Sequence, residues 1–187
     1  MSNQIGGGPT GGLDSGSLAA TRWTDRSFPA TLTKRGANLK PDFDFTELGL
    51  LFPQNNTNEK IYILDQMLHE KKFGTPLDLH IHFIQTSSDL PIFKAEYRFY
   101  NNGDTVPATW TTISTEDGEA QFSYTSGSML QIIDFPSISA PADEDVSANF
   151  EAILYRDDNI VSGDVLVKFI DYHFQKDSGG SRQEYVK

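Results

Sequence analysis

Apolar and polar residues alternate along much of this sequence. One side of the stretch 93–100 is apolar, with Phe93, Ala95, Tyr97 and Phe99. The residues between them are mostly charged, namely Lys94, Glu96, Arg98 and then Tyr100. A period of two puts the apolar residues on one face of an extended chain, so the stretch predicts a half-buried β-strand. The sequence Asn101–Asp104 tolerates positive φ and predicts a turn at the end of this strand.

Seven further stretches have the same alternation or a composition rich in β-forming residues, and these are 43–52, 60–66, 77–85, 108–113, 120–133, 148–156 and 163–175. Segments rich in Gly, Asn, Asp or Pro separate them, as at 53–56, 116–118 and 157–159. The only helical stretch that we expect is one or two turns near 65–72. About eight short strands with this spacing predict an all-β sandwich. A jelly roll is the first expectation, and an immunoglobulin-like sandwich is the second.

The length of 187 residues suits one domain with two loose ends. Residues 1–20 contain little apolar surface and six glycines, so we expect a flexible arm there. Residues 21–175 are expected to form the β-sandwich, and 176–187 a C-terminal tail. Each end is either a plain disordered terminus or an arm that becomes ordered against a neighbouring subunit.

The composition excludes several classes of function. The chain has 26 acidic and 15 basic residues, a formal charge of −11, which opposes binding to nucleic acid or to an anionic membrane. It has no cysteine, which excludes disulfides, cysteine-ligated zinc and thiol catalysis. We find no signal peptide and no run of eighteen apolar residues, so we expect synthesis and assembly in a host cytoplasm.

Two of the four histidines, His80 and His82, are two residues apart in a predicted strand. Both imidazoles should therefore project from one face, opposite Leu79, Ile81 and Phe83. Such a pair is a known start of a zinc, iron or manganese site, with His173 as a conceivable third ligand and Glu96 as a fourth. The alternative is a pair of hydrogen-bonded histidines on a half-buried sheet face.

The spacing from Gly74 to the histidine pair resembles the first half of the cupin metal motif. Thr86 and Ser87 stand where a cupin has its glutamate, and no clear second motif follows. Signatures of a hydrolase elbow, a phosphate loop or an HExxH metalloprotease are also missing from the sequence. We therefore predict a protein without a cofactor or catalytic residues. The acidic runs 143–145 and 157–158 are expected to be solvated loops.

Several stretches, read together, resemble a group of tailed-bacteriophage structural proteins. They are 50–55, 59–62, 66–69, 79–83, 93–97 and 171–184. The marks of this group are a PHxHW-like strand and a terminal D-x-H-(Y/F)…D-(S/T)-x-GSR-x-E segment. Leu68 replaces the proline of the group's QMPH, and Phe83 replaces its tryptophan. Both replacements keep an apolar residue, and the resemblance spans about residues 40–187.

The resemblance implies a virion structural protein. We expect a decoration or cement protein that binds the major capsid protein on the outer surface of the head, as a homo-oligomer, with a trimer favoured over a dimer. The aromatic residues Trp23, Phe28 and Tyr185 are candidate interface anchors, since such residues dominate hot spots, although core or arm packing would also explain them. Arg182, in the terminal segment, is a fourth candidate interface residue.

Three alternatives to head decoration remain open from the sequence. The first is a structural or adsorption protein at the neck, fibre base or tail. The second is a module that binds host glycans on a fibre or tail. The third is a cupin-like metalloenzyme that uses His80, His82 and a distant third ligand.

Overall fold

The computed structural model describes residues 22–54, 56–118, 127–157 and 163–176. These residues form eleven strands: β1 (Arg22–Pro29), β2 (Lys34–Arg35), β3 (Asp42–Asp44), β4 (Gly49–Phe52), β5 (Ile61–Gln66), β6 (Leu77–Gln85), β7 (Phe93–Tyr100), β8 (Thr111–Ser114), β9 (Gly127–Asp134), β10 (Asn149–Arg156) and β11 (Val165–Lys176). They also form two short 3-10 helices, η1 (Ala30–Leu32) and η2 (Thr115–Asp117). The predicted all-β class is confirmed.

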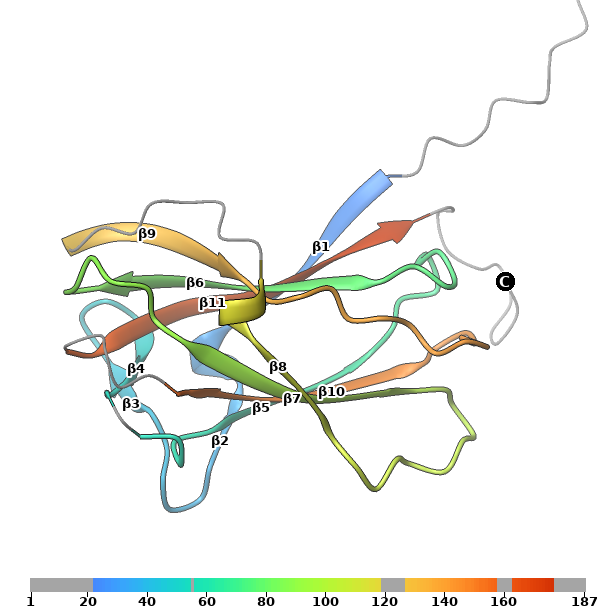
Figure 1. Ribbon diagram of the computed structural model, residues 1–187, viewed down its shortest axis with the longest axis horizontal. Helices are drawn as coiled ribbons and strands as arrows, with labels where there is room; N and C mark the ends of the chain where they lie inside the picture. The colour runs from blue at the N-terminus through green and yellow to red at the C-terminus, as the bar shows by residue number, and fades with distance from the viewer. Residues whose placement is uncertain (1–21, 55, 119–126, 158–162, 177–187) are drawn as a thin grey trace, which may run out of the picture.

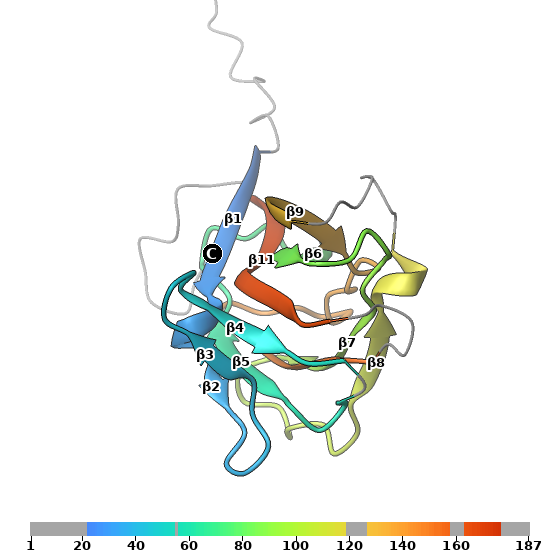
Figure 2. The same ribbon diagram turned by 90° about the vertical axis from the view of Figure 1, so that its left-hand side faces the viewer.

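The strands form two antiparallel sheets that lie one above the other (Figures 1 and 2). In the first sheet the order is β3-β4-β11-β6-β9, and in the second it is β2-β5-β10-β7-β8. The long strand β11 pairs with β6 along one side. Its other side pairs first with β4 and then with β1, where Arg22 lies opposite Lys176.

Eight successive strands, β4 to β11, give the fold its topology. Four of them lie in the order β4-β11-β6-β9 and the other four in the order β5-β10-β7-β8. The first strand of the eight is thus beside the last, as in two nested Greek keys, which is the arrangement of a jelly roll. The jelly-roll prediction is confirmed; β2 and β3 extend the edges of the two sheets, and β1 pairs with β11 beyond the stretch that pairs with β4.

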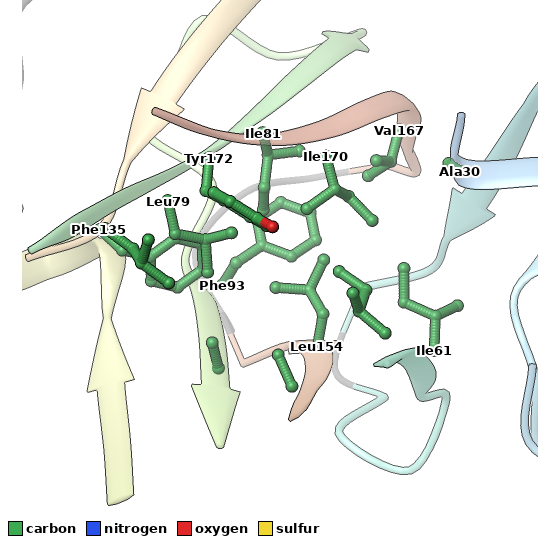
Figure 3. Packing of buried hydrophobic residues seen from close by; sticks show 14 of the residues in the cluster. Ala30, Ile61, Leu79, Ile81, Phe93, Phe135, Leu154, Val167, Ile170 and Tyr172 are labelled. Carbon is green, nitrogen blue, oxygen red and sulfur yellow. The ribbon is translucent and has the colours of Figure 1, made fainter. Parts of the chain in front are cut away.

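Alternate residues of both sheets fill the space between them. Figure 3 shows Ile81 and Tyr172 of the first sheet packed toward Phe93 and Leu154 of the second, and all four are buried. Each such side chain contributes about 1.5–3 kcal/mol by leaving water. Because hydrophobic side chains occupy the interior, the outward residues of each strand are the ones available for binding.

Several predicted boundaries agree with the structure. Strand β7 spans the predicted 93–100, and Gly103 in the predicted turn has φ of +94°. The Asn101 side chain fixes this turn, because its Nδ2 donates to the carbonyl of Asp143 at 2.9 Å. Its Oδ1 accepts from the amide of Asp145 at 2.8 Å. The turn is therefore tied to the loop before β10.

The helical turns predicted near 65–72 are wrong. Strand β5 continues to Gln66, and the amide of Met67 donates to the carbonyl of Ala148 at 2.7 Å, which extends the pairing with β10. Strand pairing thus satisfies the backbone groups that a helix would have used. In the described part of the chain, no helix has the length and apolar character needed to cross a membrane.

The predicted solvated loop at 143–145 is wrong for Glu144. Its carboxylate is 2.7 Å from Nζ of Lys71, and the two side chains are only 2% and 1% exposed. Of the other predicted acidic loop, 157–158, the structure describes Asp157, which forms an ion pair with Lys94. The predicted arm, Asp158 and tail residues 177–187 lie outside the described residues.

Candidate functional site

The outer face of the first sheet carries the histidine pair. In β6, Leu79 and Ile81 point into the core, whereas His80 and His82 point outward, as predicted. His80 is nevertheless buried, with a side chain only 6% exposed, because residues of the neighbouring strands surround it on this face. A buried imidazole needs polar partners, and β11 supplies one.

A bulge in β11 determines which of its residues reach this face. Val165 and Val167 point inward before the bulge, and Ile170 and Tyr172 point inward after it. One extra residue between Val167 and Phe169 shifts the alternation. Asp171 consequently faces outward, directly opposite His80 in the register of β6 and β11.

Three ligand atoms converge on the outer face. The Nε2 atoms of His80 and His82 are 3.1 Å apart. Oδ2 of Asp171 is 3.1 Å from Nε2 of His82 and 3.7 Å from Nε2 of His80. Asp171 was not predicted from the sequence as a site residue, although its neighbours Tyr172 and Phe174 are inward residues that place it on the outer face.

Strand β1 orients the carboxylate of Asp171. Oγ of Ser27 donates a hydrogen bond to Oδ1 of Asp171 at 2.7 Å, which leaves Oδ2 toward the histidines. Burial acts to raise the pKa of Asp171, but the neighbouring imidazoles of His80 and His82 and the hydrogen bond from Ser27 hold it well below its usual range. The site therefore contains a permanent negative charge beside two imidazoles.

Among the described residues, the structure does not add the two conceivable ligands, His173 and Glu96, to the group that converges with the histidine pair. His173 lies against His80, with ring centroids 4.5 Å apart, but its Nε2 is 3.1 Å from Oδ1 of Asp25. Among the described residues, the group that converges with the histidine pair is completed by Asp171. Glu96 lies in β7 of the other sheet, where it pairs with Lys60 at 3.5 Å.

An acidic hollow of about 560 Å³ adjoins the cluster. Its wall includes Asp78, His80, Asp117, Asp134, Ser137 and His173. Asp134 belongs to β9 and is the register partner of His80. His80 thus connects the hollow to the histidine and aspartate cluster, and three carboxylates line the approach to it.

Comparisons with known proteins give no family for the chain. No family model and no curated protein matches it. Among solved structures, the CBM36-1 domain of a multidomain xylanase from the hindgut metagenome of Trinervitermes trinervoides is similar, with 9% identity and a TM-score of 0.47 over 86% of this chain and 100% of that one. A family two carbohydrate esterase from Cellvibrio japonicus gives 9% identity and a TM-score of 0.43, over 86% of this chain and 36% of that one.

A chain in the structure of infectious bursal disease virus, Gx strain, is also similar. The identity is 10% and the TM-score 0.39, over 92% of this chain and 38% of that one. At such low identities and TM-scores, none of these proteins indicates what the present chain binds.

The predicted interface residues have different surroundings. Trp23 in β1 is 52% exposed, as an interface anchor would be. Phe28 is only partly exposed and packs against the core, with its ring centroid 5.9 Å from that of Tyr172. Arg182 and Tyr185 lie outside the described residues.

A second surface was not predicted from the sequence. It is a groove of about 470 Å³ between β1, η1 and β5, which we call the β1–β5 groove. Leu32 and Leu64 in its wall are 81% and 74% exposed, and Tyr62 and Phe28 also line it. The sequence signal is in β5, where the outward Tyr62 and Leu64 alternate with the buried Ile61 and Ile63.

Proposed function

We propose that the chain is a structural subunit of a tailed-bacteriophage virion, a decoration protein that binds the major capsid protein on the outside of the head and stabilises the shell. The β1–β5 groove is the observation that supports this function best. Exposed leucines grouped around a hollow are typical of a surface that a partner protein covers. The resemblance of the sequence to phage structural proteins indicates which kind of partner.

Charge supports the capsid protein as the occupant of the groove. The chain carries −11 overall, which disfavours packaged DNA as a partner. Lys34 lies in the wall of the groove beside the leucines, and Arg26, also in the wall, is paired with Asp65. A partner with apolar and acidic residues would complement this wall. The proposal includes a homo-oligomer, a trimer before a dimer, formed through other surfaces.

The location in the particle is tested first. Mass spectrometry of gradient-purified virions should detect the chain, and cryo-electron microscopy should show a jelly roll of this topology on the outer surface of the head. Density at the neck or tail would replace the decoration role with a role in that structure. Absence of the chain from purified virions would reject the proposed function as a whole.

The groove is tested with the variant Leu32→Glu/Leu64→Glu, added to heads that lack the protein. We expect its affinity for heads to fall about 1,000-fold, since truncated or charged hot-spot residues cost about 2 kcal/mol each, or about 4 kcal/mol together. Leu130→Glu is the matched control, because Leu130 is also an exposed leucine but lies in β9 of the first sheet. Equal binding of the double variant and the wild type, in a pelleting assay, would exclude the groove as the capsid contact.

A further inference from the structure

The spacing of the three converging atoms on the first sheet matches a metal site. The distances between Nε2 of His80, Nε2 of His82 and Oδ2 of Asp171 are 3.1, 3.1 and 3.7 Å. The centre of this triangle lies about 1.9 Å from each atom, close to the ~2.0–2.2 Å of zinc bonds to nitrogen and oxygen. An ion just above the plane would therefore contact all three atoms without movement of the strands.

Protons alone satisfy this arrangement poorly. A histidine nitrogen has one position in the ring plane, and that position holds either a hydrogen or a lone pair. Nε2 of His82 therefore cannot donate to Asp171 and accept from His80 at the same time, although both atoms are 3.1 Å away. A cation uses a lone pair from each of the three atoms, and so it satisfies both short contacts.

The surroundings favour a cation. Ser27 holds Asp171 in place through its second oxygen, as outer hydrogen bonds commonly do for metal ligands. Asp78 and Asp134 lie in the wall of the adjoining hollow, so the local potential is negative. Two imidazoles and a carboxylate are ligands that zinc and the neighbouring transition metals prefer, whereas calcium and magnesium prefer oxygen alone.

We propose that His80, His82 and Asp171 bind one divalent transition-metal ion, with two ligands from β6 and one from β11. None of the three ligands lines the β1–β5 groove, although Ser27, which donates to Asp171, is also in the groove wall. Three protein ligands leave at least one position of the ion open toward solvent or a neighbouring molecule. The ion joins β6 to β11 at the outer face of the sheet, and therefore stabilises the folded state when bound.

The test is zinc binding by untagged, chelator-treated protein. Calorimetry should show one ion per chain, and cobalt loading should give the visible absorption of a site with nitrogen and oxygen ligands. We expect His82→Ala and Asp171→Ala each to weaken zinc binding about 100-fold or more. Ser27→Ala, which removes only the hydrogen bond to Asp171, should weaken it about 10-fold.

His173→Ala is the matched control, because it removes an imidazole from the same face without removing one of the three ligands. It should bind zinc within about 3-fold of the wild type. Circular dichroism checks that each variant is folded, and the imidazole nitrogen shifts of wild-type His80 and His82 on zinc addition provide a readout that needs no variant. The proposal is overturned by a wild type that binds no zinc, by unchanged binding in His82→Ala and Asp171→Ala, or by unchanged Nε2 shifts.

Discussion

Replacing Glu144 with glutamine is expected to lower the free energy of unfolding by about 3–5 kcal/mol, the usual cost of leaving one partner of a buried ion pair without its counter-charge. Glutamine keeps the size of the side chain and can still accept from the amide of Gly74, which donates to Glu144 Oε2 at 2.8 Å. The lost stability therefore measures the cost of leaving the buried charge of Lys71 without its counter-charge. The Nζ of Lys71 still donates to the carbonyl of Thr75 at 2.8 Å. Urea unfolding followed by circular dichroism measures the loss of stability.

A double-variant cycle separates the ion pair from its surroundings. Lys71→Met combined with Glu144→Gln removes both charges, so its loss of stability should be smaller than the sum of the two single losses, by about 1–3 kcal/mol. Asp143→Asn is the control, because this neighbouring carboxylate is exposed and its change should stay within about 0.5 kcal/mol. Additive losses in the cycle would show that the pair contributes no coupling.

The second large effect is expected at Arg156, the largest of the fully buried side chains among the described residues. Its NH1 donates to the carbonyl of Phe52 at 2.8 Å and to that of Gly163 at 2.7 Å. Arg156→Met should lower the free energy of unfolding by about 1.5–4.5 kcal/mol, because the loss of the buried bond to Phe52 costs about 1–3 kcal/mol and the loss of the part-buried bond to Gly163 about 0.5–1.5 kcal/mol. Thermal and urea unfolding measure this loss.

Arg35→Met provides the comparison for Arg156. Arg35 is only partly buried, and its NH1 donates to one carbonyl, that of Pro41, at 3.2 Å. Its loss should be about 0.5–1.5 kcal/mol, the ordinary net value of a hydrogen bond. We assign to Arg156 the role of joining β10 to the end of β4, at Phe52, and to Gly163, just before β11. Equal losses of unfolding free energy in the two variants would contradict this role.

Alternation was a good guide to the strands with one apolar face and a poor guide to the others. It predicted β7 at its observed bounds and a strand over 148–156, close to the bounds of β10. It missed β1, whose sequence RWTDRSFP has no apolar face. This strand exists because its backbone pairs with β11 from Arg22 to Pro29, and such pairing leaves no local signal.

The candidate metal site was half predictable. Two histidines two residues apart in a strand share a face whatever the rest of the fold does, so His80 and His82 could be paired from the sequence. Asp171 joins them through the antiparallel register of β6 and β11, which are distant in the chain. Register across a sheet depends on the whole fold. The sequence could therefore suggest His173 as a nearby ligand, but it could not show which residue lies opposite His80.

The antiparallel pairing of β1 with the second half of β11 has a mechanical consequence. The strands β1 and β11 lie side by side (Figure 1), and Arg22 is opposite Lys176 at one end of their pairing, so a force that pulls these two residues apart acts across the strands. Under a force in this direction, the hydrogen bonds between β1 and β11 break one after another from the pulled end, and they do not bear the force together. A tether at Lys176 that is pulled against one at Arg22 would therefore peel β1 away at low force and leave the eight jelly-roll strands in place.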